Sequence, residues 1–393
     1  MIIDKSFFLS LSVFFPAICL GEFSINPIFS DGMVLQRDAK VAIWGTADPG
    51  DKVEVLFGGE NSGVVAGDDG NWIVSLNSMD ASTRAATMRV ESEGKAIVIS
   101  EVLIGDVWVC SGQSNMGFKL AKCVDGDTDV RSAVDPLIRV SGYRSSWAPC
   151  IGEAAAETSG VAYYFARKRR ELNPDVPIGL IERALSGSPI QAWTPVEALN
   201  NIPFSQEMIM RFHSDSEEGK RWFAYSEAVD ERKRRKREGD EKSSGKRPVF
   251  EGDDNTKVLS EIYYTDNLGK LWRERIQPLA KYGIAGVIWY QGERNSKGGE
   301  EEAAIYSDLL SALIKSWRAA WGQGDFRFLA VQLPPFAKGG PNWEIVRQCQ
   351  AAAVKELANA DFADLSDLPD EGQLHPANKR PVGERLAKIT VPR

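Results

Sequence analysis

The chain has 393 residues, of which 43% are hydrophobic and 26% are charged, and its formal net charge is -8. This length corresponds to about two to three domains and excludes a small disulfide-stapled protein. The excess of acidic residues gives no general basis for binding nucleic acid, and a content of 9% aromatic residues argues against disorder.

An apolar run, Phe7–Leu20, follows Lys5 near the start of the chain. It is shorter than the roughly twenty residues that a membrane-spanning helix needs. Cys19 and Gly21 place small residues where a signal peptidase would require them. We therefore expect residues 1–21 to be a signal peptide and the mature protein to be secreted or periplasmic, without stable membrane insertion. A buried N-terminal helix is the alternative.

Four cysteines would remain after such cleavage, and an oxidising compartment would allow one or two disulfides among them. Their spacing does not give the pairing. The chain has only two histidines, His213 and His375, and contains no CxxC, HExxH or phosphate-loop pattern. We therefore expect neither a metal nor an organic cofactor. The four cysteines are Cys110, Cys123, Cys150 and Cys349.

Residues 22–100 contain short apolar or alternating runs, separated by turn clusters such as Asp48–Asp51. Strands at this spacing, without helical periodicity, predict a small antiparallel β-sandwich domain. The expected strands are Val41–Trp44, Val53–Phe57, Trp72–Leu76, Met88–Glu91 and Ala96–Ile99.

Residues 101–393 alternate between strand and helix patterns, which predicts an α/β domain with a parallel sheet. Within it, residues of about 204–258 are dense in charge, and acidic neighbours offset the basic run Arg232–Arg237. We interpret this segment as a solvent-exposed insertion. The expected strands are Val107–Cys110, Pro177–Ile181, Gly286–Tyr290 and Phe326–Gln332; the expected helices are Thr158–Leu172, Tyr306–Trp321 and one from near Asn378 past Leu386.

The strand Val107–Cys110 runs directly into the sequence SGQSNM at Ser111–Met116. Ligands of open α/β sheets bind at the carboxyl ends of strands, and a serine in such a turn can stabilise an oxyanion with its own backbone N–H. Ser114 is therefore a candidate nucleophile, with a helix N-cap as the alternative role. The turn is not a GxSxG elbow, because methionine stands at the second glycine.

A serine nucleophile needs a base, and the two histidines make this choice narrow. His213 lies in the charged segment, whereas His375 lies in a Leu-His-Pro sequence just before the last expected helix. A serine and a histidine at strand ends of one sheet can meet. His375 is therefore the candidate base.

These segments resemble the sialate O-acetylesterase group of the SGNH hydrolases. The resemblance covers almost everything from Phe29 onward, and its motifs stand in the order that the family has. They are Ser30–Arg37, Gly105–Met116, Ser188–Trp193, Trp289–Glu293, Trp317–Arg318, His375–Lys379 and Val382–Ala387.

The resemblance implies a flavodoxin-like, three-layer α/β domain that follows the β-sandwich. It also implies a serine esterase that removes O-acetyl groups through an acetyl-serine intermediate, with Ser114 as nucleophile and His375 as base. The oxyanion donors would be the backbone N–H groups of Ser114 and Gly187 and the side-chain amide of Gln291. Losing one such donor typically slows an enzyme about 100-fold or more.

The acid that orients His375 is left open by the sequence. Many SGNH hydrolases place aspartate three residues before the histidine, where this chain has Gly372. Asp370 and Glu293 are the two leading candidates, followed by Asp367. A Ser-His dyad without a close acid is the remaining alternative.

The chain departs from the family pattern near the expected sugar site, at Trp272–Glu274, at Arg294 and at Ser186 of the usual glycine pair. Trp193 and Trp289 offer surface for stacking on a sugar, with a core position as the alternative. The expected substrate is sialic acid or a related acetylated sugar. The alternatives are acetylxylan or another acetylated polysaccharide and, in a different class, a carbohydrate-binding protein without turnover.

Overall fold

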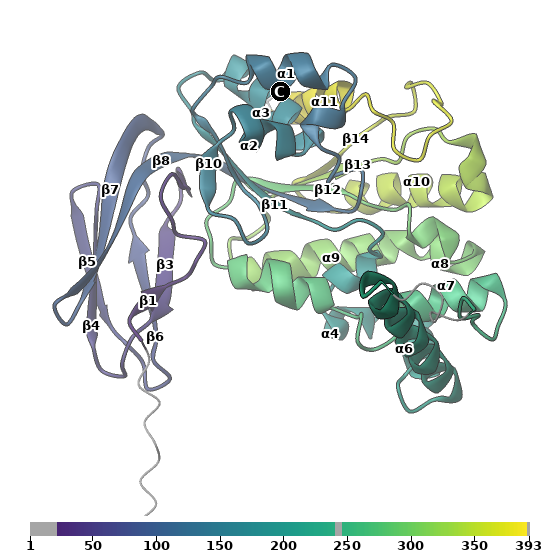
Figure 1. Cartoon of the computed structure of the whole chain (residues 1–393). Coiled ribbons are helices and arrows are strands. Elements are labelled where there is room, and N and C mark those ends of the chain that lie inside the picture. Colours follow the sequence, from purple (N-terminus) through teal and green to yellow (C-terminus); the bar gives the residue numbers. More distant parts are fainter. Residues whose placement is uncertain (1–21, 240–245, 391–393) are drawn as a thin grey trace, which may run out of the picture.

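The computed structural model describes residues 22–239 and 246–390. The predicted signal peptide falls on residues 1–21, outside the described residues. A β-rich N-terminal part is followed by a larger α/β part (Figure 1). Within the described ranges, no helix combines the length and the apolar character needed to cross a bilayer.

The N-terminal part contains two groups of strands whose buried side chains alternate along the chain, as expected for strands with one face turned to a core. Each strand predicted between residues 22 and 100 lies within an observed strand. The first group is β1 (Ser24–Ile25), β3 (Val41–Thr46) and β6 (Asn71–Leu76); the second is β2 (Val34–Gln36), β4 (Lys52–Phe57), β5 (Glu60–Val65), β7 (Ser82–Ser92) and the start of β8 (Lys95–Gly112).

Strand β8 is long enough to belong to both parts of the molecule. Its first half pairs antiparallel with β7, and its second half lies between two parallel neighbours in the α/β sheet. Asp106 sits just where the pairing changes, and it accepts hydrogen bonds from Arg37 at 2.7 Å and from Arg169 at 3.2 Å. The strand thus carries the chain directly from the N-terminal part to the centre of the second sheet.

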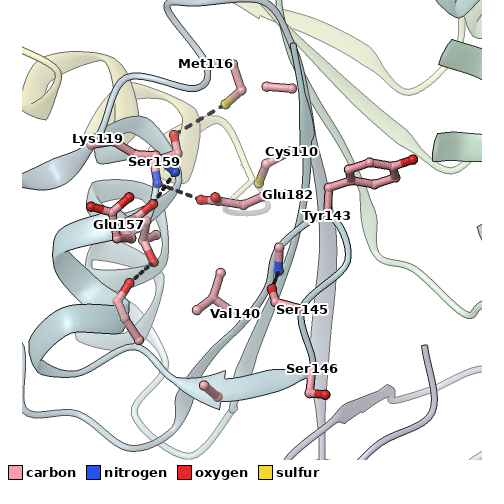
Figure 2. A pocket seen from close by; sticks show the side chains of 15 residues that line it. Cys110, Met116, Lys119, Val140, Tyr143, Ser145, Ser146, Glu157, Ser159 and Glu182 are labelled. Carbon is pink, nitrogen blue, oxygen red and sulfur yellow. Dashed lines mark hydrogen bonds between the residues drawn. The ribbon is translucent and has the colours of Figure 1, made fainter. Parts of the chain in front are cut away.

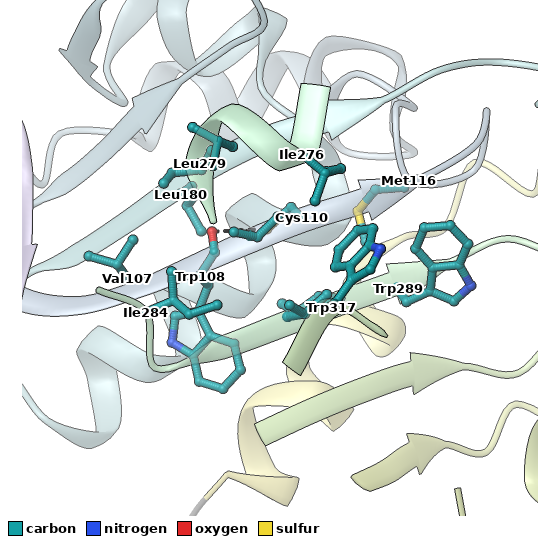
Figure 3. Packing of buried hydrophobic residues seen from close by; sticks show 14 of the residues in the cluster. Val107, Trp108, Cys110, Met116, Leu180, Ile276, Leu279, Ile284, Trp289 and Trp317 are labelled. Carbon is teal, nitrogen blue, oxygen red and sulfur yellow. Dashed lines mark hydrogen bonds between the residues drawn. The ribbon is translucent and has the colours of Figure 1, made fainter. Parts of the chain in front are cut away.

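The α/β sheet has the order β10-β9-β11-β8-β12-β13-β14, and all of these strands are parallel except β10, which pairs antiparallel with β9. Large apolar side chains of the central strands pack tightly in its core, among them Trp108 and Leu180 (Figure 3). The strands not yet bounded are β9 (Ile138–Ser141), β10 (Trp147–Pro149), β11 (Ile178–Ala184), β12 (Gly286–Tyr290), β13 (Arg327–Val331) and β14 (Ala360–Ala363).

Helices cover both faces of this sheet (Figure 1). On one face lie α1 (Gly126–Ser132), α2 (Gly152–Glu157), α3 (Gly160–Leu172) and α11 (Arg380–Ile389); on the other lie α4 (Val196–Leu199), α8 (Glu300–Ala304), α9 (Tyr306–Trp321) and α10 (Gly340–Lys355), which packs on α9. The predicted helix at 158–172 begins two residues late, because the Ser159 hydroxyl caps it by accepting from the Ala162 N–H.

The charge-dense segment folds mainly as helices α5 (Pro203–Arg211), α6 (Glu217–Arg237) and α7 (Asp254–Tyr263). The basic run Arg232–Arg237 is the last part of α6, which projects from the body of the molecule (Figure 1). Its side chains are mostly solvated, and Glu231 forms ion pairs with Arg234 and Arg235. Acidic side chains of α6 itself therefore neutralise part of this basic run.

The four cysteines of the α/β part are all free thiols. Cys110 and Cys150 are fully buried, and burial raises the pKa of both thiols. The disulfides that an oxidising compartment would allow are thus not formed here. The strands and helices hold these thiols in separate places, which spacing along the chain does not reveal.

Candidate active site

Ser114 stands just beyond the end of β8, in a tight turn that begins at Gly112. The backbone of Gly112 has φ 135°, and a Cβ atom there would lie 2.1 Å from the Tyr290 carbonyl oxygen. Only glycine fits such a close approach between β8 and β12. The turn closes with a hydrogen bond from Gly117 N–H to Gln113 C=O, which leaves Ser114 half-buried at the strand end.

His375 reaches Ser114 from the loop between β14 and α11. The distance from His375 Nε2 to Ser114 Oγ is 2.7 Å. Burial lowers the pKa of His375 below its ordinary value, and the positive charges of Lys379 and Lys297 lower it further. A neutral imidazole at this distance can accept the serine proton. The structure thus brings together the two residues singled out from the sequence, while His213 lies exposed beyond α5.

A hydrogen bond between a carboxylate and His375 is not present among the described residues, which is the arrangement that the dyad alternative allows. Asp370 instead accepts from the backbone N–H groups of Ala337 and Gly372, both at 2.7 Å. Asp367 is paired with Arg385 at 2.6 Å. Both aspartates are thereby satisfied elsewhere on an exposed loop, and the arrangement at Ser114 is a Ser-His dyad.

Glu293, the third candidate acid, belongs to a buried network beside the nucleophile. Asn115 Nδ2 donates to Glu293 Oε1 at 2.5 Å and to the carbonyl oxygen of Leu374, the residue before His375, at 3.1 Å. Lys379 Nζ donates to Asn115 Oδ1 at 2.5 Å. The network therefore ties the serine turn to the histidine loop.

The three side chains of this network are almost completely buried, with exposed fractions of 0% for Asn115 and 1% for Glu293 and Lys379. Burial raises the pKa of Glu293 to about 7 and lowers the pKa of Lys379 to about 8. Glu293 Oε2 has no hydrogen-bond partner among the described residues. Burial thus disfavours the charged forms of Glu293 and Lys379, and the Asn115 side chain forms a hydrogen bond with each of them.

Two of the expected oxyanion donors remain free. Neither the backbone N–H of Ser114 nor that of Gly187 forms a hydrogen bond within the described part of the chain. Gly187 has φ 73° and lies exposed beyond the end of β11, with no atom within 4 Å of the position that a Cβ would take. Both groups are therefore available to an incoming oxygen.

The side-chain amide of Gln291, the third expected donor, already has acceptors in this structure. It is fully buried, and its Nε2 lies within 3.2 Å of three acceptors: Gln113 Oε1, Ser188 O and Asn295 Oδ1. Gln113 was missed from the sequence, although it directly precedes the serine. Its Nε2 lies 3.5 Å from Ser114 Oγ, and Gln291 and the Arg294 N–H hold its Oε1.

A second buried carboxylate forms hydrogen bonds with residues that surround the site. Glu302 is fully buried and accepts from Gln191 at 2.7 Å, from Asn295 at 2.6 Å and from the Tyr263 hydroxyl at 2.7 Å. Burial raises the pKa of Glu302 to about 7. Because Asn295 also contacts Gln291, this network extends to the residue that holds Gln113.

The two tryptophans considered for sugar stacking are core residues. Trp193 and Trp289 have exposed fractions of 0% and 1%, and their rings pack edge to face with centroids 6.0 Å apart. Trp317 packs against Trp289 in the same way. These aromatic rings fix the sheet and the α9 layer, and they are not accessible to a sugar.

A cavity of about 510 Å³ lies beside the serine turn, on the face of the sheet that α2 and α3 cover. Met116 and Ala184 line it (Figure 2). Within it, Glu182 accepts a hydrogen bond from the Ser159 N–H at 2.6 Å, and burial raises the pKa of this carboxyl group. The cavity offers polar space next to the strand ends that carry Ser114 and Gly187.

Comparison with known proteins identifies the family. The family model described as carbohydrate esterase, sialic acid-specific acetylesterase, matches residues 104–224 and 261–391. The chain belongs to this family. The esterase is 25% identical to the sialate O-acetylesterases of rat and of human, over 90% and 93% of its length and 70% and 69% of theirs.

A solved structure agrees with this assignment. The esterase superimposes on a carbohydrate acetylesterase from Xanthomonas citri with a TM-score of 0.72 and 27% sequence identity, over 93% of this chain and 73% of the other. The two matched segments of the family model contain Ser114 and His375, respectively, and residues 225–260 fall outside both. The protein is a carbohydrate esterase that removes O-acetyl groups.

Proposed function

We propose that Ser114 and His375 remove O-acetyl groups from sialic acid or a closely related sugar through an acetyl-serine intermediate. The observation that carries this proposal is the 2.7 Å contact between His375 Nε2 and Ser114 Oγ at the carboxyl end of β8. The lowered pKa of His375 supports it, because a neutral ring can accept the serine proton over most of the physiological pH range.

The reaction begins when Ser114 Oγ attacks the acetyl carbonyl carbon and its proton passes to His375 Nε2. The carbonyl oxygen becomes negative and accepts hydrogen bonds from the free N–H groups of Ser114 and Gly187, with the Gln113 amide close by. The ester bond then breaks, and the sugar oxygen takes the proton from His375. Water attacks the acetyl-serine by the same route and releases acetate.

We also propose a detailed fold, domain boundaries and a location for the protein. We infer an SGNH-type, flavodoxin-like arrangement, which is supported by a serine after the central strand β8 and a histidine after the last strand β14. We also infer a β-sandwich of residues 22–100 before an esterase domain of residues 101–393. The secreted or periplasmic location rests on the apolar run Phe7–Leu20.

A second candidate substrate is an acetylated plant or algal polysaccharide. It is supported by the similarity to the Xanthomonas citri protein, which is a carbohydrate acetylesterase not assigned to a particular sugar. A binding protein without turnover fits the site less well, because such a protein needs no hydrogen-bonded serine and histidine beside two free N–H groups.

The mature protein should hydrolyse p-nitrophenyl acetate, and Ser114→Ala should lower kcat/KM by about 1,000-fold or more, because deleting a nucleophile leaves only residual catalysis. His375→Ala should match that loss within about tenfold, since the two residues act as a unit. The exposed His213 provides the matched control, and His213→Ala should be silent. Hydrolysis that persists in Ser114→Ala would refute the mechanism.

Release of acetate from acetylated sialic acid, acetylxylan and acetylated pectin should then be compared at equal enzyme concentration. The proposal expects the highest kcat/KM on acetylated sialic acid. A higher value on acetylxylan would favour the polysaccharide alternative while leaving the Ser-His mechanism intact.

A further inference from the structure

A cavity of about 370 Å³ that the mechanism does not use lies between the loop joining β9 to β10, the segment 274–279 and residues 26–28 of the N-terminal part. Three arginines line it: Arg144, Arg183 and Arg275. Arginine is the side chain best suited to bind a carboxylate, because its planar fork donates two parallel hydrogen bonds. Such a concentration of guanidinium groups in one cavity is therefore a sign of an anionic ligand.

Two of the three guanidinium groups lie over the same aromatic ring. Arg275 lies 4.0 Å and Arg144 lies 5.0 Å from the centroid of the Tyr143 ring. Arg183 is buried to an exposed fraction of 7%, and its pKa falls to about 10 because of this burial and the nearby charge of Arg275. The positive charges thus lie close enough to repel one another.

None of these three arginines forms a salt bridge within residues 22–239 and 246–390. Glu274 is the acidic residue that lines the cavity with them. Glu182, next to Arg183 in the chain, is directed toward Ser159 in the other cavity (Figure 2). The cavity therefore carries an excess of positive charge, and the charge of the buried Arg183 is costly to keep without an anionic partner.

Several guanidinium N–H groups have no acceptor within the described part of the chain. Arg183 uses Nη1 for the carbonyl oxygens of Ser141 and Glu182, and Arg275 uses Nη1 for the carbonyl oxygen of Ala184. The buried Nε of Arg275 has no partner, and Arg144 has no hydrogen bond to the described residues. The remaining donors can be satisfied by a planar anion in the cavity.

Arg183 and Arg275 lie at the end of β11, next to the serine turn. Ala184, whose carbonyl oxygen Arg275 holds, pairs in register with Gly112 at the start of the serine turn. The next residue, Leu185, donates its N–H to the Gly112 carbonyl oxygen, and Gly187 follows two residues later. A sugar anchored at the arginines would therefore be held next to the segments that carry Ser114 and Gly187.

We propose that Arg144, Arg183 and Arg275 form a subsite for the carboxylate of an acidic sugar and thereby select an O-acetylated sugar acid over a neutral acetylated sugar. This inference rests on the proposed function of Ser114 and His375 and adds the residues that read the substrate's charge. The ligand class is a monosaccharide that carries one carboxylate, with its hydroxyl groups facing the serine side chains of the β9–β10 loop.

The test compares kcat and KM for an O-acetylated N-acetylneuraminic acid, a peracetylated neutral sugar and p-nitrophenyl acetate. Arg275→Gln should raise KM for the acidic sugar about 10- to 100-fold, because a hydrogen bond to a charged group is lost, and any loss on the two neutral esters should be much smaller. Arg275→Lys keeps the positive charge and should recover part of the loss.

Two further variants keep the test decisive if Arg275→Gln folds poorly. Arg144→Gln removes a charge that forms no hydrogen bond to the residues that the structure describes, and it should also raise KM for the acidic sugar alone. Arg273→Gln is the matched control, because Arg273 lies on the same turn as Arg275, is exposed and does not line the cavity. Arg273→Gln should leave KM unchanged for both the acidic and the neutral sugar.

A second measurement uses free N-acetylneuraminic acid as a competitive inhibitor. It should inhibit the wild type, and inhibition should weaken about tenfold or more in Arg144→Gln. Equal losses on acidic and neutral esters, or an unchanged KM in both variants, would overturn the subsite. Hydrolysis of p-nitrophenyl acetate that depends on Ser114 would still stand in that case, so failure of the subsite is distinct from failure of the mechanism.

Discussion

Asn115 holds the two halves of the candidate site together, and the lysine behind it influences the base. Its side chain bonds Glu293, Lys379 and the carbonyl oxygen next to His375. The charge of Lys379 lowers the pKa of His375, and so does the exposed Lys297. A histidine with a lowered pKa remains a base in more acidic solution, so the acidic limb of kcat/KM should lie below pH 6.5, the ordinary histidine value.

Lys379→Met and Lys297→Met should each move this acidic limb to higher pH, because each removes a positive charge that opposes protonation of His375. The pH profile of p-nitrophenyl acetate hydrolysis measures the shift. Salt should screen the contribution of the exposed Lys297 and leave that of the buried Lys379 largely intact. Lys379→Met should also destabilise the fold by about 1–3 kcal/mol, since the Asn115 oxygen loses its donor.

Lys297→Met separates the electrostatic effect from loss of structure. Lys297 is exposed and is not part of the buried network, so its removal should leave the melting temperature unchanged. A limb that stays in place in both variants would show that neither lysine influences the base.

At the scale of elements, the short helix α8 places Glu302 where it joins α7, the segment before α4 and the loop after β12. The folded-state pKa of Glu302 is about 7, above its ordinary value of 4.5. Folding therefore favours the protonated form. The resulting stability is fully present below pH 4.5 and is lost as the pH rises through 7.

Glu302→Gln should remove this pH dependence. The difference in unfolding free energy between the wild type and the variant should change by roughly 3 kcal/mol from pH 4 to pH 8, in favour of the variant at high pH. Urea unfolding at several pH values measures it. The neighbouring Glu301 is exposed on the same helix, so Glu301→Gln is the control and should give parallel curves. Parallel curves for Glu302→Gln as well would contradict the prediction.

At the scale of the whole molecule, the N-terminal strands and the α/β part share one continuous core. Tyr282, which precedes β12, packs against Phe29 and donates its hydroxyl to the Val34 carbonyl oxygen at 2.7 Å. Trp147 donates across the same boundary to the carbonyl oxygen of Ile28 at 2.8 Å. Together with the unbroken strand β8, these contacts predict that both parts unfold in one transition.

Tyr282→Ala should lower the stability of both parts together, by about 3–5 kcal/mol as for other large aromatic truncations in a core. Near-ultraviolet circular dichroism and esterase activity should be lost at the same midpoint. Tyr225 packs in a separate small cluster with Trp222 and Phe250, so Tyr225→Ala should move that midpoint much less. Two separate transitions would show that the parts are independent.

Local patterns in the sequence were sufficient for much of the framework. The helix at 306–321 and the strand at 286–290 were predicted with the bounds that the structure has, because their apolar periodicity is strong and complete. The turn SGQSNM and the scarcity of histidine made Ser114 and His375 candidates, and the family resemblance implied their roles as nucleophile and base. Strand β5 was missed, because its residues include Asn, Ser and Gly.

Other features depended on contacts that lie far apart in the chain, and only the tertiary structure decided them. The choice among the acids followed from partners such as Arg385 and Asn115, which occupy Asp367 and Glu293. Gln291, expected as an oxyanion donor, is surrounded by buried acceptors, and Gln113 beside the serine was missed. Segments that lie far apart in the sequence line the arginine cavity. Spacing along one chain records periodicity, whereas hydrogen-bond partners and burial are set by the packing of elements remote in sequence.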